Sequence, residues 1–326
     1  MSFKKKRMRK SGALLLLACI SLYFPAQKAP AQSLRPYENI VSTESQRKIL
    51  VHLTDALTEG RAAGTAGKQL AEQYLVGQFR AMGLKPVDWA YTQSFRYGDS
   101  ITVRNVVGLL PAAGPSDEYI VVGAHYDHLG RLGHTIYPGA DDNASGVTAL
   151  LSIARMFCAM KADGKGPRKN LLFVAFDGKE LDLAGSRWFV QHLPVPRGKI
   201  TAMVNMDMLG TDLVPPRRNR EYLFAIGENT LPETYRGYLG YLCNRAYYKL
   251  DLDLTFYGSR DFYRMMYETS DQHPFARAGI PAVLFTSAFH QHTFKKTDTP
   301  DIIAYPLLRK RTLVIFNFIH RLCADN

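Results

Sequence analysis

Cysteine is scarce in this sequence: there are four, and no two of them stand in a Cys-x-x-Cys pair. The sequence therefore gives no support for a zinc site made of thiolates. We expect Cys19 to be removed with an N-terminal segment, which leaves Cys158, Cys243 and Cys323. An odd number of cysteines allows one disulfide at most and leaves at least one free thiol.

The sequence also lacks a dense basic run with interleaved aromatic residues, although its formal net charge is +12. Residues 1–31 contain seven Lys and Arg and no acidic residue, so removing them leaves a charge of only +5. This mild charge does not support nucleic-acid binding. Internal repeats are absent too, and the composition, 46% hydrophobic and 21% charged, is that of a globular protein.

The N-terminal apolar run 13-ALLLLACISLYF-24 is shorter than the roughly 20 residues of an ordinary membrane span. It follows a basic segment and precedes the small residues 29-APA-31, which is the pattern of a signal peptide. We predict a signal peptide at 1–31 and a single zinc-peptidase-like domain at 32–326, exported to the periplasm or the extracellular space without a stable membrane span. The alternatives are an uncleaved membrane anchor and lipidation at Cys19. Lipidation is disfavoured because the apolar run continues past this cysteine.

Apolar runs of strand length alternate with stretches of helical periodicity along the rest of the chain. The expected strands are 103–110, 119–124, 170–176, 200–209, 221–226 and 281–286, and the main helices are 42–59, 66–82, 145–160, 183–192, 231–247, 272–279 and 303–322. Continuous apolar strands that alternate with helices indicate a sheet buried on both faces. We predict an α/β fold of three layers, helix–sheet–helix, with a mixed sheet that is parallel at its centre.

Polar residues follow several of these apolar runs, at the ends where ligands gather in such sheets. His125 and Asp127 follow one strand, 177-DGKE-180 follows another, and Asp207 ends a third. The segment 138-PGADDNASG-146 lies at an expected helix start. One imidazole and several carboxylates form a nitrogen and oxygen ligand set that suits zinc. The sequence therefore predicts a divalent-metal site at this edge of the sheet.

Five sequence motifs carry a resemblance to a known family. They are 122-VGAHYDHLG-130, 139-GADDNASG-146, 173-FVAFDGKELDLAGS-186, 204-VNMDMLG-210 and 297-TDTPD-301. Together they resemble the co-catalytic zinc aminopeptidases, which include bacterial leucyl-type enzymes and have glutaminyl cyclases and the transferrin receptor as relatives. The resemblance extends from about residue 45 to the C-terminus.

The resemblance implies two zinc ions and assigns a role to several residues of these motifs. His125 and Asp207 would bind the first ion, Asp141 would bridge both ions, and Glu180 would bind the second. Asp127 would orient the imidazole of His125 through a hydrogen bond. The implied activity is hydrolysis of the N-terminal bond of peptides and proteins, with water activated by the metal.

Two positions depart from the family pattern. The family has Gly-Glu-Glu where this chain has Gly178-Lys179-Glu180, so lysine stands at the general-base position. The last histidine ligand of the family corresponds to Phe294, which cannot bind zinc. We predict that His292, or His290 two residues earlier, replaces this ligand; the alternative is that both are solvated loop residues.

The second zinc site is accordingly in doubt, and we expect tighter binding at the first. His128 and His134 are expected to frame the site without binding metal, and His273 is not counted as a ligand.

Lys179 allows three interpretations. It could be neutral, because burial beside two dications lowers a lysine pKa, and then accept a proton. It could stay charged, pair with a carboxylate and replace the charge of one metal ion, which would impair the site. Alternatively, another group such as Asp177 could act as the base.

The leading prediction is an exported zinc exopeptidase, an aminopeptidase of reduced or unusual activity. The alternatives are a catalytically dead binding protein on the same fold and a glutaminyl cyclase-like transferase.

Overall fold

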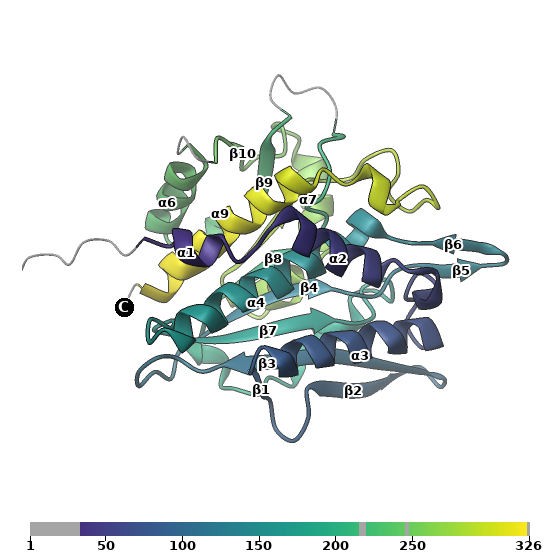
Figure 1. Cartoon of the computed structure of the whole chain (residues 1–326), viewed down its shortest axis with the longest axis horizontal. Helices are drawn as coiled ribbons and strands as arrows, with labels where there is room; N and C mark the ends of the chain where they lie inside the picture. The colour runs from purple at the N-terminus through teal and green to yellow at the C-terminus, as the bar shows by residue number, and fades with distance from the viewer. Residues whose placement is uncertain (1–32, 215–219, 245–247, 325–326) are drawn as a thin grey trace, which may run out of the picture. The chain divides into compact units, whose positions relative to one another are not determined.

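The computed structural model describes residues 33–214, 220–244 and 248–324 (Figure 1). Residues 34–326 form one compact unit, and the following description concerns this unit. The predicted signal peptide lies outside the described residues, so its cleavage stays a prediction. Cys158, Cys243 and Cys323 are all free thiols.

A nine-stranded sheet runs through the unit, and its central strands are parallel. The order is β1 (Lys85–Pro86), β3 (Ile101–Leu110), β7 (Asn170–Phe176), β4 (Tyr119–His125), β8 (Ile200–Met206), β11 (Ala282–Thr286), β9 (Tyr222–Ile226) and β10 (Asp251–Asp253), with β2 (Thr92–Tyr97) paired to β3. The four strands β7, β4, β8 and β11 are parallel to one another, whereas β1, β2 and β3 on one flank and β9 on the other join antiparallel. A separate hairpin consists of β5 (Gly130–Leu132) and β6 (Thr135–Tyr137).

The central strands are buried on both faces, as their continuous apolar sequences require. In β7, Leu171, Phe173 and Ala175 enter one core cluster, and the alternating Leu172 and Val174 enter another on the opposite face. Successive side chains of a strand point to opposite faces, so one apolar run supplies both cores.

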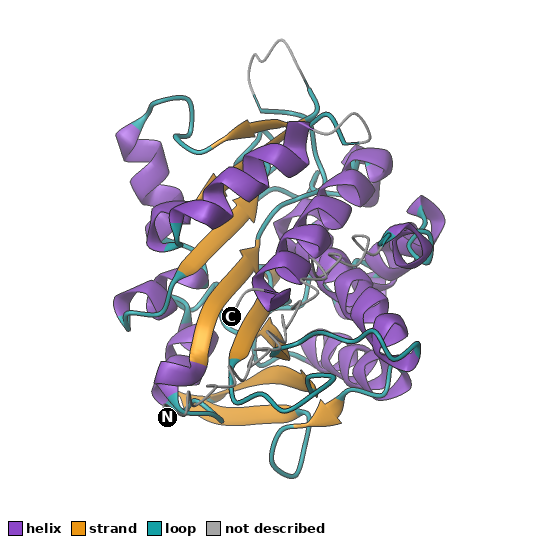
Figure 2. Cartoon of the chain, turned by 90° about the vertical axis from the view of Figure 1, so that its left-hand side faces the viewer, coloured by secondary structure: helices purple, strands orange, loops and turns teal. Residues whose placement is uncertain are grey.

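Helices cover each face of the sheet (Figures 1 and 2). Figure 1 shows one set in front of the strands, and the core of this side includes residues of α1 (Arg35–Glu38), α2 (Thr43–Leu53), α3 (Ala66–Ala81), α4 (Gly146–Ala162), α6 (Glu233–Asn244) and α9 (Tyr305–Ala324). The core of the other face includes residues of α5 (Ala184–Gln191) and α8 (Gln272–Arg277). The remaining helix α7 (Arg260–Glu268) contacts β9 and α8.

One helical stretch, Ala140–Ala162, is long and apolar enough to cross a membrane, but 83% of its apolar window is buried inside the unit. It includes α4, which packs on β4, β7 and β8. We interpret it as a core helix. The predicted three-layer α/β fold with a mixed, centrally parallel sheet is confirmed, and the carboxyl ends of β7, β4, β8 and β11 lie at one edge.

Candidate metal centre

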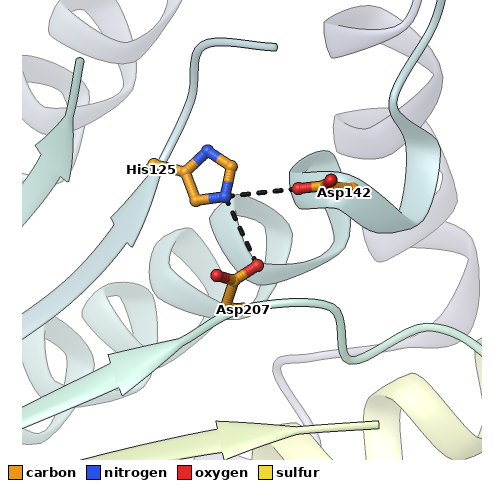
Figure 3. A group of neighbouring side chains, drawn as sticks. All are labelled: His125, Asp142 and Asp207. Carbon is orange, nitrogen blue, oxygen red and sulfur yellow. Dashed lines mark hydrogen bonds and ion pairs between the residues drawn. The ribbon is translucent and has the colours of Figure 1, made fainter. Parts of the chain in front are cut away.

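Three buried side chains meet at this edge and form what we call the first group: His125, Asp142 and Asp207 (Figure 3). His125 is the last residue of β4, and Asp207 directly follows β8. His125 Nε2 lies 3.3 Å from Asp207 Oδ1 and 3.4 Å from Asp142 Oδ1. All three residues are at most 2% exposed. One imidazole nitrogen and two carboxylates facing a common point are a ligand set that suits zinc.

Asp142, rather than Asp141, lies in this group, which corrects the role predicted for Asp141. Asp141 Oδ1 accepts a hydrogen bond from the amide of Gly210 at 2.6 Å, and its Oδ2 accepts one from the Thr211 hydroxyl at 3.1 Å. Both oxygens of buried Asp142, by contrast, have no hydrogen-bond partner among the described residues. A buried carboxylate without hydrogen bonds is costly, and a metal ion would satisfy it. Of the two aspartates, Asp142 is therefore the one placed to bind a metal ion.

The backbone around Asp142 explains why neighbouring aspartates point in different directions. The turn η2 (Ala140–Ser145) is irregular, with φ −102° and ψ 91° at Asp142. The carboxylate of Asp298 accepts hydrogen bonds from the amides of Asp141 and Asp142, and the Asn143 side chain donates to the carbonyl of Met206 at 2.9 Å. Side-chain hydrogen bonds, rather than helix periodicity, thus fix this turn.

Gly146 is required by the same turn, because its α-carbon packs tightly against the neighbouring atoms. A β-carbon at this position would lie 2.3 Å from Asn143 Oδ1 and 2.6 Å from the Met206 carbonyl. Any larger residue at this point would push the turn that carries Asp142 away from β8.

A serine that the sequence analysis missed supports Asp207. Ser270 Oγ donates to Asp207 Oδ2 at 2.6 Å and accepts from Asn205 Nδ2 at 2.8 Å. Burial opposes the charge on Asp207, but His125 and Lys179 together hold its pKa below the ordinary value. Asp207 is therefore an oriented, ionised carboxylate, as a metal ligand must be. The only sequence signal for Ser270 was its position in the segment 270-SDQHPF-275.

Asp127 lies beside His125, as predicted, although its carboxylate has other hydrogen-bond partners. His125 Nδ1 is 3.1 Å from the main-chain oxygen of Asp127 and 3.7 Å from its carboxylate. The carboxylate accepts hydrogen bonds from the amides of Lys179 (3.1 Å) and Glu180 (3.0 Å). Asp127 thus orients the imidazole through its backbone and ties the β7 loop to the β4 end.

His128, Asp142 and Glu180 form a second group, whose potential ligand atoms lie within 4.8 Å of one another. His128 is 1% exposed, and neither of its ring nitrogens has a hydrogen-bond partner among the described residues. Burial lowers its pKa to about 4, so the imidazole is neutral and able to bind a cation. The sequence led us to expect that His128 frames the site without binding metal, whereas the structure places it in a group that could hold a metal ion.

Lys179 projects into the second group. Its Nζ lies 2.9 Å from Glu180 Oε1 and 3.6 Å from Asp142 Oδ1. Burial favours the neutral amine, but Asp142, Asp207 and Glu180 outweigh it and raise the pKa of Lys179 well above its ordinary value. The carboxylates around Lys179 therefore favour its charged form, whereas the neutral-amine interpretation depends on two bound dications and stays a prediction.

Asp177 is engaged elsewhere, which argues against it as a substitute base. Its Oδ2 lies 2.9 Å from the ammonium of the fully buried Lys68 and accepts from the amide of Arg104 at 2.8 Å. Burial raises the pKa of Asp177 to about 6. The carboxyl group belongs to a buried ion pair beside the site rather than to either group.

The two histidines of the loop after β11 contact other side chains. His292 Nδ1 lies 2.9 Å from the Thr297 hydroxyl, and His290 Nε2 lies 3.1 Å from Asp141 Oδ2. Neither histidine belongs to a metal-type cluster of the described residues, so the ligand role of His292 stays a prediction without support from these contacts. Phe294, at the family's histidine position, instead places its ring centroid 5.6 Å from Lys179 Nζ.

Comparisons with known proteins show what this chain is similar to. The model of peptidase family M28 matches residues 105–319. Leupeptin-inactivating enzyme 1 of Streptomyces exfoliatus is 28% identical over 235 residues, 72% of this chain and 46% of that protein. Human transferrin receptor protein 2 is 34% identical over 116 residues, 35% of this chain and 14% of the receptor.

Among solved structures, BSAP, a zinc aminopeptidase from Bacillus subtilis, has a TM-score of 0.69 at 15% identity and covers 86% of this chain and 95% of its own. At this identity the likeness concerns the fold. The chain spans less than half the length of the curated relatives that it matches.

Proposed function

Because the chain belongs to peptidase family M28, we propose that it is a zinc-dependent aminopeptidase that hydrolyses the N-terminal bond of peptides or proteins. The observation that carries this proposal is the first group, in which a histidine and two carboxylates converge and the oxygens of Asp142 have no hydrogen bond among the described residues. Zinc would be held by His125, Asp142 and Asp207. When bound, zinc supplies Lewis-acid chemistry, polarising a carbonyl and lowering the pKa of water.

The chain's own residues prepare this site. Ser270 and Asn205 fix the orientation of Asp207, and the main-chain oxygen of Asp127 fixes the tautomer of His125. The carboxylates of Asp142, Glu180 and Asp207 outnumber the single ammonium of Lys179. This negative balance favours cations, which include the protonated N-terminus of a peptide as well as a metal ion.

Lys179 also affects the rate of hydrolysis that we expect. Loss of a general base costs about 10²–10⁴-fold, and Lys179 places a charged donor where the family has that base. We therefore propose slow hydrolysis rather than none. The same residue favours a second candidate function, in which the chain binds peptides or proteins without cleaving them, as a fold can be used for recognition alone.

The test compares chromogenic aminoacyl anilides with their N-acetylated counterparts on zinc-depleted and zinc-restored protein. We expect zinc-dependent cleavage of the free-amine substrates only, and none by an Asp142→Asn variant. Equal cleavage of the acetylated substrates would contradict an aminopeptidase. Binding of zinc and of free-amine peptide without turnover would favour the second candidate.

Export is part of the proposal and is supported by the basic and apolar segment ahead of Ala31. N-terminal sequencing of the protein recovered from the periplasm or medium tests it. Retention of residues 1–31 on a cytoplasmic protein would contradict it.

A further inference from the structure

The ammonium of Lys179 lies among the oxygens of the second group. It contacts two of that group's three members, Glu180 at 2.9 Å and Asp142 at 3.6 Å. The Lys179 side chain is 9% exposed, and the oxygens belong to side chains that are 20% and 0% exposed. A positive charge therefore already sits where these carboxylates converge.

The third member of the group is His128, whose ring lies close enough to Asp142 and Glu180 to bind the same ion. It has no hydrogen-bond partner among the described residues. Its two ring nitrogens are buried and have no hydrogen bond with the described part of the chain, and Nδ1 is 3.9 Å from Asp142 Oδ2. A buried imidazole with no hydrogen bond is destabilising unless a cation or water satisfies it. The group thus contains a ligand that the ammonium leaves unused.

Phe294 completes the environment of the ammonium. Its ring centroid lies 5.6 Å from Lys179 Nζ, within the range at which an aromatic face attracts a lysine cation. Phenylalanine offers no donor atom to a metal ion but does stabilise an organic cation. The two departures from the family pattern therefore have one physical explanation. Lys179 supplies an ammonium and Phe294 stabilises it, whereas neither residue can bind a second divalent ion.

We propose that Lys179 is a tethered cation that takes the place of a second metal ion, so that the native chain binds a single divalent ion, at the first group. Removing the ammonium opens a second zinc site formed by His128, Asp142 and Glu180. The inference rests on the proposed function in one respect, that the first group binds zinc.

The test measures zinc per chain by elemental analysis after equilibrium dialysis at buffered free zinc. We expect one zinc ion for the native chain and two for Lys179→Met, which keeps most of the length of the side chain but removes its charge. Lys179→Arg keeps the charge and should bind one ion. Lys296→Met removes a charge from an exposed lysine in the loop after β11 and should also bind one.

A double variant assigns the ligands of the new site. Adding His128→Ala to Lys179→Met should return the count to one zinc ion per chain. Lys179→Gln provides a second neutral variant should Lys179→Met fold poorly, with circular dichroism reporting the fold of each protein.

The outcomes separate this inference from the proposed function. Two zinc ions in the native chain, or one in both neutral variants, would contradict the proposal that Lys179 replaces a second metal ion. Either result would still be compatible with a zinc-dependent aminopeptidase. A second ion that survives His128→Ala would overturn the role of His128. No zinc in any variant would overturn the proposed function and the inference together.

Discussion

The first group and the second group share Asp142 but are built differently around it. His125 and Asp207 stand at the ends of the buried strands β4 and β8, and Ser270 and Asp127 fix their orientation. Glu180 and Lys179 belong to the loop after β7, and Phe294 belongs to the loop after β11. Strand ends hold ligands in place, whereas loops tolerate substitution. This difference fits the proposal that strand ends hold the ligands of the first group, whereas a loop places a lysine in the second.

The largest effect should follow from Asp142, because it is the one residue common to both groups. Asp142→Asn should abolish zinc binding and lower hydrolysis by about 10³-fold or more, since a bound metal contributes several kcal/mol of charge stabilisation. Zinc titration and an aminoacyl anilide assay measure these effects.

Asp141→Asn is the matched control for this prediction. It should leave zinc binding intact, because Asp141 is occupied by Gly210 and Thr211. Loss of zinc from Asp141→Asn with retention in Asp142→Asn would reverse our assignment of the two aspartates.

Lys179→Glu should remove the ammonium from the second group and restore a base at once. We expect hydrolysis to rise by about 10²–10⁴-fold, the usual contribution of a general base. Steady-state kinetics on free-amine substrates measure the gain. Lys179→Gln is the control, since it removes the ammonium without supplying a base, and an equal gain in both variants would argue against a missing base.

Ser270→Ala affects the first group only, because it removes the hydrogen bond that Ser270 donates to Asp207. Zinc affinity should fall by about 10–100-fold, as is typical when a hydrogen-bond partner of a ligand is lost. Ser287 is a buried serine whose hydroxyl donates to the Met208 carbonyl, so Ser287→Ala is a matched control. If the two variants weaken zinc binding equally, Ser270 has no specific role.

Zinc should also stabilise the folded chain by a modest amount. A ligand present at 100 times its dissociation constant stabilises a protein by about 2.7 kcal/mol when it binds the native state only. Thermal unfolding with and without zinc measures the shift. An Asp142→Asn chain that gains the same stability from zinc would place the ion outside both groups.

The smallest effect on metal binding is expected from the loop histidines. His290→Gln and His292→Gln should leave the zinc content unchanged. His290→Gln should lower the free energy of unfolding by about 1–3 kcal/mol, because it disturbs the contact of His290 with buried Asp141. A loss of zinc in either variant would restore that histidine as a ligand and contradict the structure.

The sequence predicted the sheet and most of the first group for an identifiable reason. Apolar runs of strand length define the parallel strands, and their carboxyl ends place His125 and Asp207 together without knowledge of any contact. The family motifs added Glu180 and showed that Lys179 was anomalous. Short elements without a long apolar run, such as β1, β2, β5, β6 and α7, were not predicted.

What the sequence did not predict depends on local geometry. Asp141 and Asp142 are adjacent and chemically identical, and only the irregular turn fixed by Asn143 and Asp298 determines which one faces the site. The loop after β11 directs His292 toward Thr297, which its spacing from His290 does not reveal. Periodicity describes regular backbone, so it could not locate ligands held by turns.

One measurement tests the central claim most directly: the anomalous scattering at the zinc edge from crystals of the native chain grown with zinc. The account predicts one peak about 2.0–2.2 Å from His125 Nε2 and from oxygens of Asp142 and Asp207, with Lys179 Nζ in the second group. A peak bound by Asp141 or His292, two peaks in the native chain, or no peak would contradict it.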